Sequence, residues 1–174
     1  MKKSALSICF LLLASGFISG LANPSAAVKK EIDLFLTAWH RAAAEADAAT
    51  YFDSLAAGAI FLGTDLRERW EKEDFQKWAM PYFKPPAAWV FSASRRHIYL
   101  SADGRTAWFD EDLVSRSYWP CRGSGVLEKI AGQWRIRQYN LAFTIPNEAS
   151  KEIKLSVQAA FARQSAAETQ SVLK

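Results

Sequence analysis

Alternating strands in the second half of the chain constrain the fold most. Thr106 to Val114 reads T-A-W-F-D-E-D-L-V, and Val126 to Ile145 holds two further strands joined at Ala131-Gly132. Before them, Trp89 to Leu100 reads as a long strand, and a D-G turn follows it. Strands separated by short turns that contain glycine are typical of antiparallel hairpins. The second half therefore predicts an antiparallel meander.

The first residues have the pattern of a secretory signal peptide. Lys2 and Lys3 precede an apolar run from Ala5 to Ile18, and small residues follow as far as Ala22. The run is shorter than the roughly 20 residues that a membrane-spanning helix needs. We therefore expect residues 1–22 to be removed ahead of Asn23 and the protein to be exported to the periplasm or the extracellular space.

The charge pattern limits the classes of partner. The chain has 174 residues and a net charge of +4, and loss of Lys2 and Lys3 would lower that charge. The remaining basic residues alternate with acids and form no stripe, so nucleic acid is an unattractive partner. No later stretch reads as a membrane span, so we expect no membrane association after cleavage. We expect one domain at residues 23–147 and a C-terminal helix or tail at residues 148–174.

Cleavage would leave Cys121 as the one cysteine, because Cys9 lies inside the apolar run. An intramolecular disulfide would then be excluded. A buried thiol, a reactive thiolate beside Arg122 and an intermolecular bridge remain as alternatives.

The first half has helical spacing. Val28, Ile32, Phe35 and Trp39 recur at steps of four, three and four, which predicts a helix with one apolar stripe that ends near Ala46. The sequence then predicts a short helix capped by Asp47 and ended by Gly58, a strand from Ala59 to Leu62, and a helix from Glu71 to Phe83.

Several motifs in this order resemble the nuclear transport factor 2-like superfamily. The segment G-Q-W-R-I at Gly132 to Ile136 resembles the last strand of that superfamily. Four stretches are similar to an exported SnoaL-like branch: G-T-D-L-R-E-R-W (Gly63 to Trp70), A-W-F-D-E (Ala107 to Glu111), C-R-G-S-G-V-L (Cys121 to Leu127) and Q-Y-N-L (Gln138 to Leu141).

The resemblance implies an α+β fold of the cystatin-like kind, in which a cone-shaped, bent antiparallel sheet wraps around N-terminal helices. It also implies a mostly apolar cavity, open at one end, and a homodimer formed through the outer sheet face. The apolar residues Phe109, Leu113 and Tyr139 would form part of that outer face. The superfamily contains isomerases, dehydratases, cyclases and non-enzymatic domains, so the fold does not fix the function.

Alternation along strands predicts polar residues at the cavity. Trp134, Ile136, Gln138 and Asn140 are two residues apart, and such residues share a face of a sheet. The resemblance implies that Gln138 and Asn140 reach the cavity, although both amides could instead bond to backbone at a bend of the sheet. It also implies that Arg122 and Ser124, on the preceding strand, lie near the same cavity.

Asp110 is the candidate catalytic residue. The resemblance favours an inward Asp110, where a carboxylate with a raised pKa could act as general base. A structural ion pair with Arg122 is the alternative role. Glu111 replaces Asp110 if the register is wrong by one, because a slip of one residue exchanges the two faces.

Aromatic residues supply the apolar part of the predicted site. His40 and His97 are the only histidines, which argues against a metal centre, and we expect no cofactor. We expect His40 on the helix surface and His97 packed along its strand. The aromatic residues expected near the cavity, as core or as ligand contacts, are Trp39, Tyr51, Phe61, Trp70, Tyr82 and Trp108.

These observations predict an exported domain that binds a small, partly apolar ligand. Two alternatives remain, an isomerase or lyase that uses a cavity carboxylate as general base and a non-catalytic dimeric interaction domain. The volume of the cavity distinguishes these alternatives, because a site of roughly a few hundred Å³ would support binding or catalysis and a filled cone would support the interaction domain.

Overall fold

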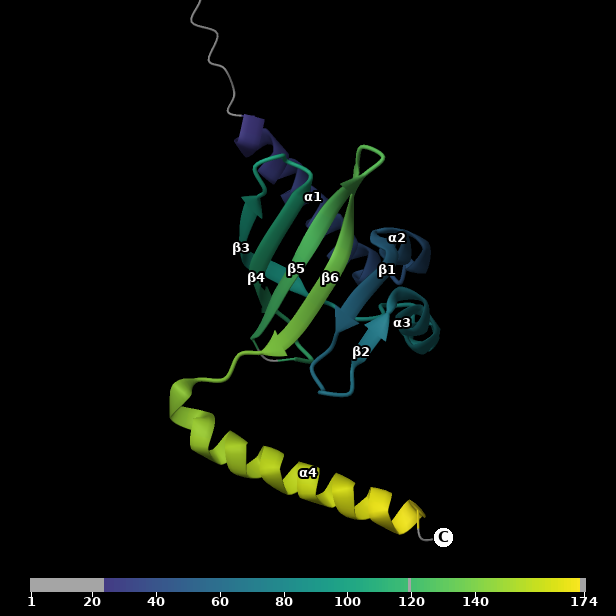
Figure 1. Ribbon diagram of the computed structural model, residues 1–174, viewed down its shortest axis with the longest axis vertical. Helices are drawn as coiled ribbons and strands as arrows, with labels where there is room; N and C mark the ends of the chain where they lie inside the picture. Colours follow the sequence, from purple (N-terminus) through teal and green to yellow (C-terminus); the bar gives the residue numbers. More distant parts are fainter. Residues whose placement is uncertain (1–23, 119, 173–174) are drawn as a thin grey trace, which may run out of the picture.

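A bent six-stranded sheet wraps around the first helix (Figure 1). The computed structural model describes residues 24–118 and 120–172, so the predicted signal peptide lies outside the described residues. The strand order is β2-β1-β6-β5-β4-β3. The helices are α1 (Pro24–Ala44), α2 (Ala48–Asp53), α3 (Lys72–Ala79) and α4 (Ser150–Val172), and the strands are β1 (Leu55–Leu62), β2 (Arg69–Glu71), β3 (Ser92–Leu100), β4 (Thr106–Val114), β5 (Cys121–Ile130) and β6 (Gln133–Phe143).

The predicted meander is confirmed as β3 to β6, whose neighbouring strands all pair antiparallel. β1 joins β6 in parallel, and the short β2 pairs antiparallel with β1 at the edge of the sheet. The sequence did not predict β2, because three residues are too few for an alternation to show. The fold is of the predicted α+β class.

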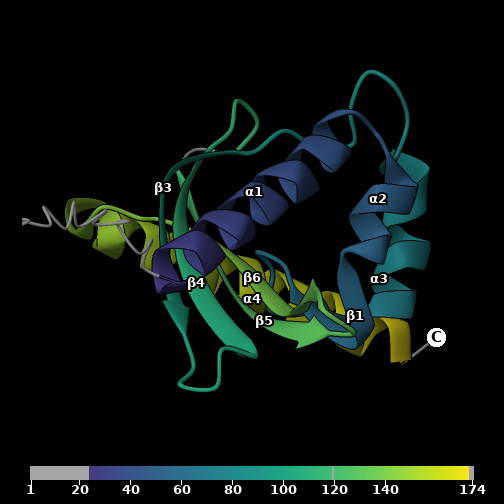
Figure 2. The same cartoon turned by 90° about the horizontal axis from the view of Figure 1, so that it is seen from above.

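α1 lies across the concave face of the sheet (Figure 2). Ile32, Leu36, Trp39 and Ala43 are buried along one side of this helix and form the centre of the core. Their spacing repeats the apolar stripe of the sequence, so burial of that stripe fixes the helix against the strands.

The boundary between α2 and β1 differs from the prediction. Asp47 caps α2 as expected, since its side chain accepts a hydrogen bond from the backbone N–H of Thr50. α2 already ends at Asp53, however, and β1 begins at Leu55. Gly58, with a φ of 65°, produces an irregularity inside the strand instead of ending the helix.

The end of α3 also differs from the prediction. α3 stops at Ala79, and Met80–Tyr82 form a 3₁₀ turn around Pro81. Proline cannot donate a backbone hydrogen bond, which accounts for the shorter helix.

A bulge in β6 changes which side chains face the core. Leu127 pairs with Ile136, but the preceding Val126 pairs with Gln138, so Arg137 is the extra residue. A bulge of one residue reverses the alternation beyond it. Trp134 and Ile136 are therefore buried before the bulge, and Tyr139 and Leu141 after it.

α4 leaves the body at the end of the molecule where β1 and β6 finish (Figure 1). Along it, Ile153, Leu155, Val157 and Phe161 are exposed. The helix predicted after Glu148 is thus present and extends away from the core. None of the helices in residues 24–118 and 120–172 is long and apolar enough to cross a membrane.

Candidate functional site

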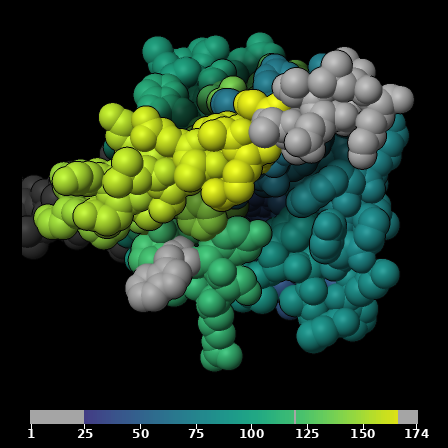
Figure 3. All heavy atoms as spheres, turned by 90° about the horizontal axis from the view of Figure 1, so that it is seen from below, coloured from purple at the N-terminus to yellow at the C-terminus, as the bar shows by residue number. Residues whose placement is uncertain are grey.

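An aromatic hollow opens at the end of the molecule where β1 and β6 finish. Its volume is about 80 Å³. Figure 3 views the molecule from this side, with α4 lying across it. The lining residues are Trp39, His40, Tyr51, Phe61, Gly63, Thr64, Glu68, Trp70, Phe75, Trp78, Trp89, Phe91, Tyr118, Tyr139 and Leu141.

Four of the six predicted aromatic residues, Trp39, Tyr51, Phe61 and Trp70, line this hollow. Trp39 stacks on Tyr51 with ring centroids 5.0 Å apart, and Phe61 stacks on Phe75 at 3.9 Å. Both stacked pairs belong to the lining of the hollow. Whether the pairs contact a ligand stays a prediction.

The prediction was wrong for the other two aromatic residues. Tyr82 follows the shortened α3 and is exposed beside Trp78, 5.2 Å away. Trp108 is on the outer face of the sheet, stacked on the exposed Tyr99 at 5.8 Å. Strand alternation puts Trp108 outside, because Ala107 and Phe109 on either side of it are buried.

The predicted polar residues of β6 are also on the outer face. The bulge at Arg137 turns Gln138 and Asn140 outward and brings Tyr139 to the hollow in their place. Gln138 is exposed. Asn140 lies with Arg122 and Ser124 beside a separate, shallow surface depression.

Arg122 and Ser124 are on the outer face of the sheet because the glycines that alternate with them along β5 are on the inner face. Gly123 and Gly125 face inward, where the strand approaches Tyr139 and Phe109. Arg122 therefore meets Asp112, at 3.5 Å, and not the predicted Asp110.

Glu111, and not Asp110, is the inward carboxylate of β4. Asp110 is on the outer face, opposite His97 of β3 and Ser124 of β5. Glu111 is fully buried, with 0% of its surface exposed. The register that the resemblance favoured was thus wrong by one residue, and the alternative residue is the inward one.

Two residues of the hollow hold one oxygen of Glu111. His40 Nε2 lies 2.7 Å from Glu111 Oε1, and the Tyr139 hydroxyl donates to the same oxygen at 3.1 Å. His40 is buried and not on the helix surface as predicted. His40 and Tyr139 thus connect the enclosed carboxylate to the hollow.

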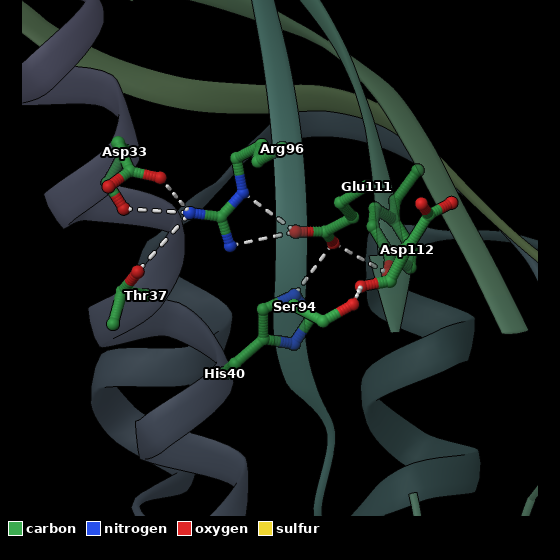
Figure 4. A network of polar contacts seen from close by, with 8 residues as sticks. Asp33, Thr37, His40, Ser94, Arg96, Glu111 and Asp112 are labelled. Atoms are coloured by element: carbon green, nitrogen blue, oxygen red, sulfur yellow. Dashed lines mark hydrogen bonds and ion pairs between the residues drawn. The ribbon is translucent and has the colours of Figure 1, made fainter. Parts of the chain in front are cut away.

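Arg96 holds the other oxygen of Glu111 (Figure 4). Its Nε and Nη2 atoms lie 2.8 Å and 2.7 Å from Glu111 Oε2. Its Nη1 donates to the carboxylate and backbone oxygens of Asp33 and to Thr37 on α1. These residues form a cluster that joins α1, β3, β4 and β6 and ends at the half-exposed Asp33. The cluster consists of Asp33, Thr37, His40, Arg96, Glu111 and Tyr139.

The cluster keeps Glu111 ionised. Burial alone would raise the pKa of Glu111, but the hydrogen bond and charge of His40, with the charge of Arg96, outweigh burial and lower that pKa. Burial and the nearby Glu111 charge raise the pKa of Tyr139 well above its usual value, so this hydroxyl stays protonated and donates. A base must have a free lone pair to accept a proton, and the oxygens of Glu111 are occupied by donors.

Gly123 makes room for this arrangement. A Cβ atom at this position would overlap the Tyr139 hydroxyl and lie 2.7 Å from Glu111 Oε1. No larger residue fits there without displacing the cluster.

The sequence held signals for these residues that we missed. His40 follows Leu36 by four residues and precedes Ala43 by three, so it belongs to the buried stripe of α1. On β4, Ala107, Phe109 and Leu113 form an apolar alternation that includes Glu111. Arg96 carried no local signal.

Other chemically reactive residues lie outside the hollow. His97 is exposed on β3. Cys121 is buried, and burial raises the pKa of its thiol. Of the three alternatives considered for this cysteine, the structure shows the buried thiol. In the described part of the chain, no group of three or more His, Cys, Asp or Glu side chains could hold a metal ion.

The sequence matches the SnoaL-like domain family over residues 32–146, which include the whole sheet and the cluster. The chain therefore belongs to this family. No curated protein matches the sequence.

Solved structures share the nuclear transport factor 2-like fold. A protein of unknown function from Pseudomonas putida KT2440 with this fold has 14% identity and a TM-score of 0.57, over 71% of this chain and 92% of that chain. The association domain of C. elegans CaMKII has 15% identity and a TM-score of 0.56, over 68% and 98% of the two chains. A proposed scytalone dehydratase from Novosphingobium aromaticivorans DSM 12444 has 8% identity and a TM-score of 0.59, over 70% and 87%. At these identities the likeness concerns the fold.

Proposed function

We propose that this domain binds a small, flat, partly apolar molecule in the aromatic hollow. The observation that carries the proposal is the combination of stacked aromatic residues in the lining with two polar lining residues, His40 and Tyr139, that Glu111 holds in place. Pockets that are mostly apolar and hold a few fixed polar groups are the usual form of small-molecule sites.

The size of the hollow limits the ligand. Pockets for drug-sized molecules have volumes of roughly 300–1,000 Å³, whereas this hollow has about 80 Å³. An apolar cavity of about 150 Å³ can hold benzene. The hollow has about half of that volume, so one ring enters only in part and the remainder of the ligand lies at the open mouth.

Filling the hollow tests the proposal. Leu141→Trp adds bulk at the wall, so it should abolish quenching of tryptophan fluorescence by small aromatic compounds that quench the wild type. Leu66→Trp is the matched control, because Leu66 is 82% exposed on a loop and does not line the hollow. Equal quenching in wild type and Leu141→Trp would overturn the proposal. Mass spectrometry of the purified protein would identify a ligand that is retained.

Catalysis by a cavity carboxylate is the less favoured function. Glu111 is the inward carboxylate, but its oxygens are held by Arg96, His40 and Tyr139, and its pKa is lowered. A general base needs an accessible lone pair and a pKa near the working pH. The binding function requires neither.

We also propose that the protein forms a homodimer through the outer face of the sheet. The residues first expected there, Phe109, Leu113 and Tyr139, are buried in the core. The support is instead the exposed, stacked pair of Tyr99 and Trp108, together with the shared fold of a domain described as an association domain. Light scattering tests this, and a monomer at high micromolar concentration would contradict it.

We propose, finally, that the protein is exported and processed after Ala22, on the basis of the apolar run that begins at Ala5. N-terminal sequencing of the exported protein tests this. An exported chain that still begins with Met1 would contradict it.

A further inference from the structure

His40 has one ring nitrogen without a partner at the wall of the hollow. Its Nε2 is directed at Glu111 Oε1, 2.7 Å away, and its Nδ1 is on the side of the ring away from Glu111 (Figure 4). Within residues 24–118 and 120–172, no group forms a hydrogen bond with Nδ1. Since His40 lines the hollow, Nδ1 is the one polar atom that its side chain can offer to a ligand.

The cluster fixes which nitrogen carries the proton. An ionised carboxylate can only accept hydrogen bonds, so the hydrogen between His40 and Glu111 must be on Nε2. In the neutral imidazole the lone pair is then on Nδ1. In the imidazolium form Nδ1 carries a hydrogen as well, so Nδ1 can share a hydrogen bond with a hydroxyl group in either form.

The remaining wall disfavours an anionic ligand. Glu68 is the acidic residue of the lining, and none of the lining residues is a lysine or an arginine. A ligand carboxylate would therefore enter an apolar site without a cationic partner, which costs free energy.

We propose that the ligand is a small phenol, whose ring lies between the aromatic walls and whose hydroxyl forms a hydrogen bond with His40 Nδ1. This inference rests on the proposed binding function and adds the chemical class of the ligand. Glu111 is a positioning residue in this account, because it orients His40 and does not touch the ligand. A hydroxyl group on an aromatic ring meets both features of the site, the aromatic lining and the ring nitrogen of His40.

Nitrogen NMR of the wild-type protein tests the inference directly. The probes are phenol and toluene, which have similar shapes and differ in the hydroxyl. Phenol should shift the ¹⁵N signal of His40 Nδ1, and toluene should bind without that shift. His97 is the internal control, because it is exposed on β3 and its signals should not move with either compound.

A variant tests the same point by affinity. His40→Phe keeps a flat ring and removes the hydrogen-bonding nitrogen, so the preference for phenol over toluene should fall about tenfold, the effect of one hydrogen bond. His97→Phe should leave the preference unchanged. Thermal unfolding shows whether His40→Phe is folded, and if it is not, the wild-type NMR result decides alone.

The outcomes separate the two proposals. If toluene and phenol both bind and neither moves the Nδ1 signal, the phenol inference is overturned and the binding function stands. If neither compound binds, the binding function falls and the inference falls with it.

Discussion

Glu111 Oε1 and His40 Nε2 lie 2.7 Å apart and join the middle of the sheet to α1 across 71 residues of sequence. Both side chains are buried, and Arg96 and Tyr139 complete the shell around the carboxylate. Such a cluster is stable only when all its groups are paired, since an unpaired buried charge is costly. It therefore fixes the orientation of His40 at the hollow.

Removing the carboxylate should destabilise the protein strongly. Glu111→Ala leaves the buried guanidinium of Arg96 without its main partner, so the free energy of unfolding should fall by about 3–5 kcal/mol. Asp110→Asn is the control, because Asp110 is the next residue of β4 but faces outward. Its effect should stay within about 0.5 kcal/mol. Urea denaturation measures both, and equal effects would contradict the assigned register of β4.

Deleting the Tyr139 hydroxyl should have a smaller effect. Tyr139→Phe removes one hydrogen bond to an ionised acceptor, which is worth roughly 1.5–3 kcal/mol. Tyr99→Phe is the matched change on the exposed face of β3 and should be neutral. If Tyr139→Phe left the free energy of unfolding unchanged in the same urea series, the stability of the buried Glu111 would not depend on this donor.

Enlarging Gly123 should disturb the cluster without changing any charge. A methyl group at this position overlaps the Tyr139 hydroxyl and crowds Glu111, so Gly123→Ala should cost about 1–3 kcal/mol. Ser124→Ala, on the outward side of the same strand, is the control. Similar melting temperatures for the two variants would argue against the packing described.

Acid should weaken the fold through Glu111. The folded-state pKa of Glu111 is below its usual 4.5, so Glu111 contributes stability above that value and loses the contribution as the pH falls through the folded-state pKa. Asp65, with a pKa lowered to about 2, and Asp112 titrate in the same acid range. The difference between wild type and Glu111→Gln isolates Glu111. Unfolding free energies measured from pH 7 to pH 2 should converge for the two proteins in acid, and a constant difference would contradict the assignment.

The antiparallel meander and the central helix could be predicted because their periodicity is local. The faces of β6 could not, because one extra residue at Arg137 reverses the alternation and leaves no clear mark in the sequence. The alternation of β6 therefore predicted Gln138 and Asn140 at the cavity, where Tyr139 lies instead. A bulge depends on how two strands pair, which the alternation of one strand does not record.

The cluster itself was missed for a different physical reason. Charged residues are rarely fully buried, so Glu111 was considered only as the replacement for Asp110, and Arg96 was not singled out. Their burial depends on contacts between β3, β4 and α1, which are distant in sequence. Two inward glycines on β5, Gly123 and Gly125, were the available sign of a close approach.

A crystal structure of the protein soaked with phenol tests the central claim most directly. We expect electron density for one ring in the aromatic hollow, with the phenol oxygen about 2.7–3.2 Å from His40 Nδ1 and with His40 Nε2 still bonded to Glu111. A hollow that remains empty at saturating phenol, or phenol bound only elsewhere on the molecule, would contradict the account.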